Sequence, residues 1–304
     1  MKLSPIILFV FNRPDHTLRT LQALKENILS DQSELYIFCD GPGTNATSAQ
    51  KEKIEEVRNK IRTQKWCKSN HIIESEINKG LSHSIISGVS EIIKQYDRVI
   101  VLEDDIVPSP GFLKYMNEAL SMYDNNEAVG CIHAWNYNLD SKDYNESTFF
   151  LKGADCWGWA TWERAWKEFN PNGKELLQTI RQKKLTFEFT RRNTHPFLRM
   201  LKDQIKGKND SWAIRWHASL IIKNMYCLHP TRAIVENIGL DNSGVHCKEM
   251  EFNQKPIDFV ELNRIPVTES DWFFREYQSF DKKMKLTHGK WLKLKNSLKR
   301  FFPQ

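Results

Sequence analysis

The sequence lacks the features that would assign it to a membrane, secreted or zinc-binding class. No run approaches the ~18 apolar residues that a bilayer-spanning helix needs. No C-x-x-C pair occurs, and no Cys/His group has the spacing of a zinc site. The opening stretch, MKLSPIILFVFNRP, has no small-x-small cleavage site, so we interpret it as a buried strand rather than a signal peptide. The six irregularly spaced cysteines are typical of reduced thiols in a cytosolic protein.

Acidic residues are absent between Lys282 and Arg300, a stretch that holds eight Lys/Arg. The whole chain has a formal net charge of +6, so the remainder is near neutral and we expect no nucleic-acid partner. Within residues 282–304, apolar side chains recur at helical spacing among lysines. This pattern predicts a basic amphipathic helix that makes a peripheral membrane contact. An ordinary docked helix with a solvated basic face is the alternative.

Strand and helix patterns alternate along the first hundred residues. The hydrophobic content of 40% over 304 residues is ample for a large core. Apolar runs predict strands at 5–11, 34–39, 70–75 and 98–105. Helical spacing predicts helices at 13–27, with Asp15 as N-cap, at 48–64 and at 81–96. This order predicts an α/β fold with a mostly parallel central sheet and helices on both faces.

Polar residues follow each of these four strands. They are Asn12 and Arg13, then Asp40 and Gly41, then residues 78–80, and finally three consecutive acids, Glu103, Asp104 and Asp105. Ligands of open α/β sheets bind beyond the carboxyl ends of the strands, so we expect these residues to share one site.

The three adjacent acids need a strongly positive partner, because like charges repel and burial disfavours carboxylates. A divalent cation is the simplest partner, and hard oxygen ligands suit Mn²⁺ or Mg²⁺. The site offers few protein ligands, so a diphosphate would supply further oxygens. A salt-bridged or solvent-facing loop is the alternative.

The second half is less regular. Residues 128–138 and 147–166 predict strands that run into turns and a helix, and residues 210–230 predict a long helix followed by a strand. Residues 237–247, NIGLDNSGVHC, have the composition of a loop. No internal repeat or low-complexity linker occurs.

Several segments together resemble a known family. They are VFNRPDHTLRTLQAL, FCDGPG, VLEDDIVPSPGFLKYM, HAWNYN, GWATWERAW, NDSWAIRW and HPTRAIVENIGLDNSGVHC. In this order they resemble GT-A fold (Rossmann-like) glycosyltransferases, both the N-acetylglucosaminyltransferase I type and bacterial surface-polysaccharide transferases. The resemblance covers roughly residues 4–247, but the segment 174–208 has no clear match.

The resemblance implies roles for the strand-end residues. Asp105 would bind the metal that bridges the donor diphosphate. Asp104 would reach the ribose, and Glu103 the sugar side of the donor. Arg13 and Asp40 would flank the nucleotide, with Asp40 near a uracil edge.

The resemblance also implies roles outside the acidic triplet. Asp210 matches the position of the catalytic base, although an Asp before a helix is also good N-cap chemistry. His246 lies in a loop that would close over the donor near the diphosphate. Lys79 would touch phosphate, or remain a solvated loop cation.

Aromatic and histidine side chains add weaker candidates. Trp135, Trp157 and Trp159 could stack on sugar faces, but core packing explains them almost as well. His133 and His217 are expected to be structural.

These expectations combine into one function. We expect a metal-dependent, inverting glycosyltransferase, a hexosyl- or N-acetylhexosaminyltransferase. It would move a sugar from a nucleoside-diphosphate sugar, with UDP favoured, to a free or lipid-linked glycan in surface polysaccharide synthesis. The expected location is the cytoplasm or the inner face of its membrane. Residues 1–250 would form the GT-A domain, with a nucleotide-sugar half (1–106) and an acceptor half (107–250), and residues 251–304 a C-terminal extension.

Two other functions stay open at this point. A nucleotidyltransferase would also bind nucleotide with metal, but the first strand end, VFNRPDHT, lacks a Gly-rich basic triphosphate loop. A non-catalytic carbohydrate- or nucleic-acid-binding protein has no need of adjacent carboxylates, which repel a polyanion.

Overall fold

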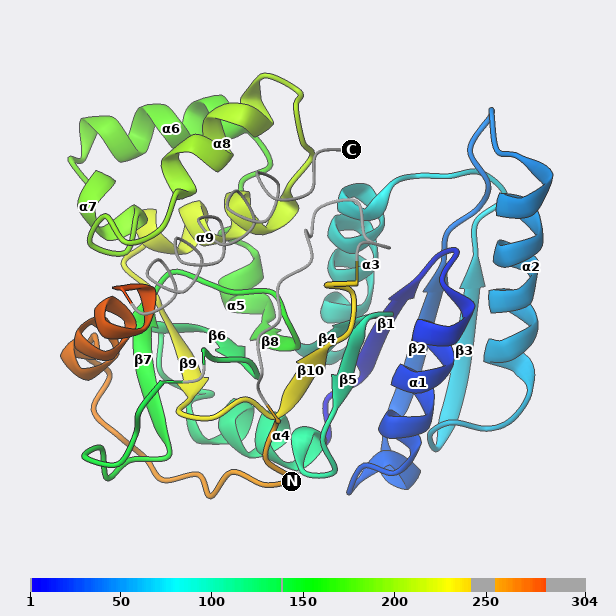
Figure 1. Ribbon diagram of the computed structural model, residues 1–304, viewed down its shortest axis with the longest axis horizontal. Helices are drawn as coiled ribbons and strands as arrows, with labels where there is room; N and C mark the ends of the chain where they lie inside the picture. Colours follow the sequence, from blue (N-terminus) through cyan, green and yellow to red (C-terminus); the bar gives the residue numbers. More distant parts are fainter. Residues whose placement is uncertain (1, 138, 242–254, 283–304) are drawn as a thin grey trace, which may run out of the picture.

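The structure is a computed structural model that describes residues 2–137, 139–241 and 255–282. Its centre is an eight-stranded sheet in the order β3-β2-β1-β4-β8-β6-β9-β7, and β5 and β10 form a separate two-stranded ribbon (Figure 1). The strands are β1 (Ile6–Val10), β2 (Glu34–Cys39), β3 (Ser69–Glu74), β4 (Arg98–Glu103), β5 (Ile106–Pro108), β6 (Val129–His133), β7 (Thr148–Lys152), β8 (Trp159–Trp162), β9 (Tyr226–Pro230) and β10 (Val235–Asn237).

Helices cover both faces of the sheet. They are α1 (Pro14–Lys25), α2 (Ser48–Arg62), α3 (Leu81–Tyr96), α4 (Phe112–Met122), α5 (Glu163–Trp166), α6 (Gly173–Gln182), α7 (Thr186–Phe189), α8 (Phe197–Ile205) and α9 (Trp212–Ile222), with a 3₁₀ turn, η1 (Ser30–Gln32), and a further helical stretch at 271–282. The predicted α/β class, with a mostly parallel central sheet flanked by helices, is confirmed.

The first four strands form a fully parallel block, in which β1 pairs with β2 and β4, and β2 pairs with β3. Strand β8 pairs antiparallel with both β4 and β6 and so joins this block to the rest of the sheet. Two successive antiparallel pairings restore the direction, so β4 and β6 run the same way, and β9 is parallel to β6. The carboxyl ends of β1, β4, β6 and β9 therefore lie along one edge.

The apolar run of β1 explains why it sits in the centre of the sheet. Side chains alternate between the two faces of a strand, so a strand buried on both sides must be apolar at every position. Ile6 and Leu8 pack in the core beneath α1, α2 and α4, whereas Ile7 and Phe9 pack in the core beneath α3, α5 and α9. The result is a three-layer α/β/α arrangement with its site-forming loops at the strand ends.

The prediction that Asp15 caps the first helix is wrong. Helix α1 begins after Arg13, whose side chain makes no capping bond, and Pro14 occupies the first helical position. Proline there needs no N–H partner, so the helix starts without a side-chain cap. The Arg13 side chain is consequently directed toward the end of β4, where it makes ion pairs.

The segment 174–208, which had no clear family match, folds as part of a small helical lobe of α6, α7 and α8. Figure 1 shows this lobe above the sheet, on the side toward which the arrows of β1, β2 and β3 point. A separate apolar cluster that includes Leu176, Ile180, Phe189 and Leu201 fills its interior and docks it against α9. The lobe therefore lies over the sheet edge that carries the predicted site.

No helix within the described residues is long and apolar enough to cross a bilayer. The five cysteines of the described ranges are free thiols, as predicted for them. Residues 283–304, which make up almost all of the predicted amphipathic tail, lie outside the described residues.

Candidate active site at the carboxyl edge of the sheet

The acidic end of β4 is held by one arginine. The Arg13 guanidinium contacts Oδ1 of Asp104 through Nη2 and lies 2.9 Å from Oδ2 of Asp105 through Nη1. Thr20 donates a hydrogen bond of 2.8 Å to the carbonyl of Asp104 and ties this turn to α1. Strands β1 and β4 are neighbours in parallel register, which places the residue after one strand beside the residues after the other.

One guanidinium does not neutralise three carboxylates. Burial, reinforced by the charges of Asp105 and Asp104, raises the pKa of Glu103 to about 8. Burial likewise raises the pKa of Asp104 to about 6, although the adjacent Arg13 acts in the opposite direction. Burial alone would lower the pKa of Arg13, but its two carboxylate partners raise it. Burial and mutual repulsion thus disfavour the ionised forms of Glu103 and Asp104, and a further cation at this strand end would favour them.

A second chain segment closes directly over Asp105. The backbone N–H of Ile238 donates to the Asp105 carbonyl at 2.9 Å. A Cβ atom on Gly239 would lie 2.1 Å from Oδ2 of Asp105, so only glycine allows this approach. His16 of α1 holds the same segment, with Nε2 3.2 Å from the Ile238 carbonyl and 3.3 Å from a carboxylate oxygen of Asp241.

Asp40, at the end of β2, is bound by backbone amides. Its carboxylate accepts hydrogen bonds from the N–H groups of Gly41, Lys79 and Gly80, at 2.9 to 3.1 Å. These bonds fix the loop between β3 and α3 to the end of β2. Lys79 is therefore positioned at the site through its backbone.

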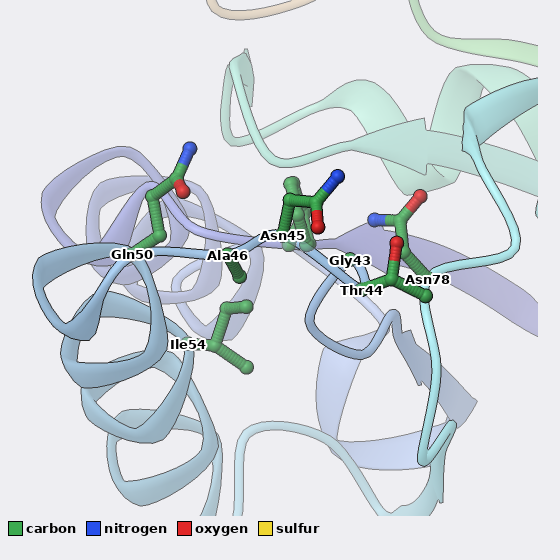
Figure 2. Close-up of a pocket in the computed structure, with 8 residues that line it drawn as sticks. Gly43, Thr44, Asn45, Ala46, Gln50, Ile54 and Asn78 are labelled. Carbon is green, nitrogen blue, oxygen red and sulfur yellow. The ribbon is translucent and has the colours of Figure 1, made fainter.

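A pocket lies beside Asp40, at the ends of β1, β2 and β3. Its volume is about 330 Å³, and Figure 2 shows the amide groups of Asn45, Gln50 and Asn78 directed toward the same side. Phe11, directly before the segment that carries Arg13, contributes an aromatic ring to the lining. A flat, amide-bearing ligand suits a pocket of this composition.

Asp210 lies just before α9, and its structural environment excludes the N-cap alternative. Ser211 is the N-cap, because its hydroxyl accepts from the N–H of Ile214. Asp210 is instead largely exposed and accepts from Nη2 of the buried Arg215 at 2.8 Å. The same Arg215 nitrogen donates to the hydroxyl of Ser82 at 2.5 Å. This contact places Asp210 beside the first turn of α3, near Lys79 and the bound Asp40.

A buried polar cluster at the same edge was not predicted. His133 ends β6, His229 lies in β9, and their Nδ1 atoms are 3.2 Å apart. Asp155, in the loop between β7 and β8, is 3.9 Å from Nε2 of His229 and receives a 2.6 Å bond from the buried Arg191. The chain spacing gives no hint of the cluster, because its members come from four separate segments. The one signal available in the sequence was the position of the two histidines, because His133 and His229 each lie at or beside the carboxyl end of a strand.

The donor atoms of His133, Asp155 and His229 all lie within 4.8 Å of one another, as a metal site requires. Burial lowers the pKa of His133 to about 4 and that of His229 well below its usual range, so both rings are neutral. Burial alone would raise the pKa of Asp155, but Arg191 outweighs it and keeps the pKa well below its usual range. Asp155 and Arg191 balance each other, so this cluster needs no further cation, unlike the end of β4.

The three candidate sugar-stacking tryptophans differ in position. Trp159 is fully buried in the core, so the expectation that it stacks on a sugar is wrong. Trp157 is partly exposed and packs edge-on against Trp135, with ring centroids 4.7 Å apart. The backbone N–H of Trp157 donates to Nε2 of His133 at 3.2 Å. The structural role expected of His133 is thus to anchor this turn.

The structure thus brings Arg13 to Asp104 and Asp105, and Asp40 to the backbone of Lys79 at the same sheet edge. Asp210 is held beside Ser82 of α3 by Arg215. His246, the predicted diphosphate contact, lies outside the described residues.

The segment that carries the three acids is similar to known sequences. A model of the GNT-I family matches residues 90–175, from α3 to the start of α6. The predicted resemblance to N-acetylglucosaminyltransferase I is thereby confirmed, and the segment includes the whole acidic end of β4.

A curated relative agrees with this assignment. The alpha-1,3-mannosyl-glycoprotein 2-beta-N-acetylglucosaminyltransferase of Arabidopsis thaliana is 30% identical over 80 residues, which are 25% of this chain. The match spans about a fifth of that relative, 18% of its length. The likeness to this GNT-I family enzyme thus concerns one segment rather than the whole protein.

Solved structures with some likeness include two of TarS from S. aureus. One is 17% identical and covers 49% of this chain and 25% of that chain, with a TM-score of 0.30. The other, of TarS residues 1–349, is 14% identical and covers 52% of this chain and 47% of that chain, with a TM-score of 0.32. Scores this low do not extend the GNT-I assignment.

Proposed function

We propose that the protein is a metal-dependent, inverting glycosyltransferase that uses a nucleoside-diphosphate sugar as donor. The observation that carries this proposal is that three adjacent acids, Glu103, Asp104 and Asp105, share one arginine at the end of a buried strand, on the same sheet edge as a nucleoside-sized pocket. A single divalent cation between the acids and a bound diphosphate would offset the negative charge of both, which gives the three adjacent acids a function. The match of residues 90–175 to the GNT-I family model supports the same activity.

The residues at the end of β4 fit a hard divalent cation, Mn²⁺ or Mg²⁺. Their donors are carboxylate oxygens, and within the described residues Glu103 has no ion-pair partner of its own. Asp105 would hold the ion, with Glu103 beside it. When bound, the ion supplies charge neutralisation for the leaving diphosphate.

The donor nucleoside would enter the pocket of Figure 2. Phe11 offers a ring for stacking, and Asn45, Gln50 and Asn78 offer amide groups that can pair with the edge of a uracil. Arg13 and Lys79 border the space between this pocket and the acids, where a diphosphate would lie. Asp40 would act mainly by holding the backbone amides of residues 79 and 80 in place.

Asp210 would accept the proton of the acceptor hydroxyl. Its carboxylate is exposed at the rim, and Arg215 fixes its orientation from below. One base on the side opposite the leaving group corresponds to a single in-line displacement, which inverts the anomeric carbon. The acceptor would be a glycan, free or lipid-linked, of a bacterial-type surface polysaccharide.

The remaining expectations extend this proposal. Residues 1–106 would form the nucleotide-sugar half and residues 107–250 the acceptor half. Residues 282–304 would contact the inner face of the cytoplasmic membrane. Liposome cosedimentation of the full chain and of a variant without 282–304 checks this contact, and equal binding would contradict it.

Calorimetric titration with UDP, GDP and CDP tests the proposal, with Mn²⁺ present and after its removal with EDTA. We expect Mn²⁺ to strengthen UDP binding by about tenfold or more, and Asp105→Asn to abolish this strengthening. Asp97→Asn is the matched control, because Asp97 flanks the opposite end of β4 and its left-handed conformation tolerates asparagine. Failure of all three nucleotides to bind the folded protein would refute the proposed function.

A further inference from the structure

Arg13 occupies the position from which a cation would act on Asp105. Its Nη1 lies 2.9 Å from Oδ2 of Asp105, and its Nη2 contacts Asp104 at the same time. Asp104 is almost fully buried, whereas Arg13 keeps a side-chain exposure of 21%. The guanidinium is thus anchored through Nη2 on a buried carboxylate, whereas its Nη1 is buried beside Asp105 without a hydrogen bond that meets the usual geometry.

The other side of the same Asp105 oxygen is closed by the chain. Gly239 lies so near that a Cβ atom would overlap Oδ2, and Ile238 is hydrogen-bonded to the backbone of Asp105. An ion that binds Asp105 through Oδ2 therefore has to share, or take over, the side on which Arg13 lies. Two positive groups about 4 Å apart repel strongly in a partly buried site.

A diphosphate offers Arg13 an alternative partner. The planar guanidinium binds phosphate oxygens through two parallel hydrogen bonds, a geometry that lysine cannot reproduce. Arg13 contacts the acids and follows Phe11 of the nucleoside pocket by two residues, so a phosphate between the pocket and the acids would lie on the Arg13 side of the site.

We propose that Arg13 is a resident counter-cation that holds Asp105 in the absence of metal and moves to the donor diphosphate when metal and nucleotide bind together. This inference rests on the proposed function and deepens it. Its consequence is that metal and nucleotide bind cooperatively. The metal displaces Arg13 from Asp105 and so frees it for the diphosphate, and the diphosphate binds Arg13 and so frees Asp105 for the metal. By linkage, the factor by which UDP strengthens Mn²⁺ binding equals the factor by which Mn²⁺ strengthens UDP binding.

The test measures the Mn²⁺ dissociation constant calorimetrically, with and without saturating UDP. In the unmodified chain we expect UDP to strengthen Mn²⁺ binding by about tenfold or more. Arg13→Lys keeps a charge on Asp104 but cannot span both carboxylates. It should bind Mn²⁺ alone at least about fivefold more tightly, and the effect of UDP should shrink correspondingly. Arg13→Met should show the same change more strongly.

Controls separate this inference from the proposed function. Arg19→Lys, on the exposed side of α1, should leave the coupling unchanged. A melting curve shows whether Arg13→Met folds. If it does not fold, the coupling measured in Arg13→Lys alone still tests the role of Arg13. Coupling of the same size in Arg13→Lys as in the unmodified chain overturns the role of Arg13 and leaves the proposed function intact. No binding of Mn²⁺ or UDP by the unmodified chain would remove the proposed function itself.

Discussion

Arg215 of α9 and Ser82 of α3 are joined by a 2.5 Å hydrogen bond, although 133 residues separate them. The same guanidinium nitrogen also donates to Asp210, so the first turns of two helices from different halves of the chain fix one carboxylate. The exposed Asp210 is thereby held next to the loop that carries Lys79.

If Asp210 is the base, Asp210→Asn should lower kcat by about 10²- to 10⁴-fold. The affinity of the Asp210→Asn variant for UDP and Mn²⁺ should equal that of the unmodified chain, because Asp210 lies outside the acidic triplet. Single-turnover sugar transfer and calorimetry on the same preparation measure the two quantities. Arg215→Lys should give a smaller loss of kcat that follows the disturbed orientation of Asp210. Full activity of Asp210→Asn would assign the base to another residue.

Gly239→Ala should weaken Mn²⁺-dependent UDP binding, because the new methyl group would collide with Oδ2 of Asp105. Either the segment 237–241 or the carboxylate must then move. The free energy of unfolding should change by less than about 1 kcal/mol, since this segment is not part of the core. Glu236→Gln, on a half-exposed side chain of the same segment, is the control. Unaltered binding would show that Asp105 does not need its present position.

The buried His217 should make the protein sensitive to acid. Its Nε2 lies 3.0 Å from the Phe189 carbonyl, and its Nδ1 lies 3.1 Å from both the N–H and the carbonyl of Ala154, so the ring is enclosed by backbone. Burial lowers its pKa from the ordinary 6.5 to about 4, so below pH 6.5 the unfolded chain binds more protons than the folded one. The stabilising contribution is complete above pH 6.5 and is lost as the pH falls toward 4, by on the order of 3 kcal/mol.

Urea unfolding at a series of pH values measures this effect. His217→Gln should reduce the dependence between pH 6.5 and 4, because the buried His133 and His229 remain, whereas His83→Gln, on an exposed side chain, should leave it unchanged. Equal slopes in His217→Gln and the unmodified chain would contradict the assignment.

Arg191→Met should destabilise the fold by about 3–5 kcal/mol, because it leaves the Asp155 carboxylate without its buried partner. Chemical denaturation provides the measurement. The double variant Arg191→Met, Asp155→Leu should recover most of the loss, since it removes both charges. With Arg191 gone, His133, Asp155 and His229 become a site with one negative charge, and Zn²⁺ should stabilise Arg191→Met but not the unmodified chain. A stabilising effect of Zn²⁺ on both would mean that the cluster already binds metal.

The parallel half of the sheet could be predicted from sequence because its signals are local. The continuous apolar run of β1 and the apolar spacing of α3 each require only a few neighbouring residues. The polar strand ends follow from the topology, and the structure does bring Arg13 to the acids of β4.

The second half could not be predicted in the same way, because its arrangement depends on distant contacts. Strand β8 has four residues and pairs with β4 on one side and β6 on the other. Nothing in its sequence indicates these two partner strands. The buried pair of Asp155 and Arg191 joins segments 36 residues apart. Local spacing also favoured Asp15 as the N-cap of the first helix. In the structure α1 begins one residue earlier, at Pro14, which has no N–H group that needs a capping partner.

The position of β8 between β4 and β6 has a consequence for how the protein is made. Residues 6–103 can pair all four parallel strands before any later strand exists, whereas β6 has no hydrogen-bonded neighbour toward β4 until residue 162 has been synthesised. Chains fold from the N-terminus during synthesis. The edge of β4 therefore stays open while about sixty further residues leave the ribosome, and α9 with the preceding Asp210 can dock only later still.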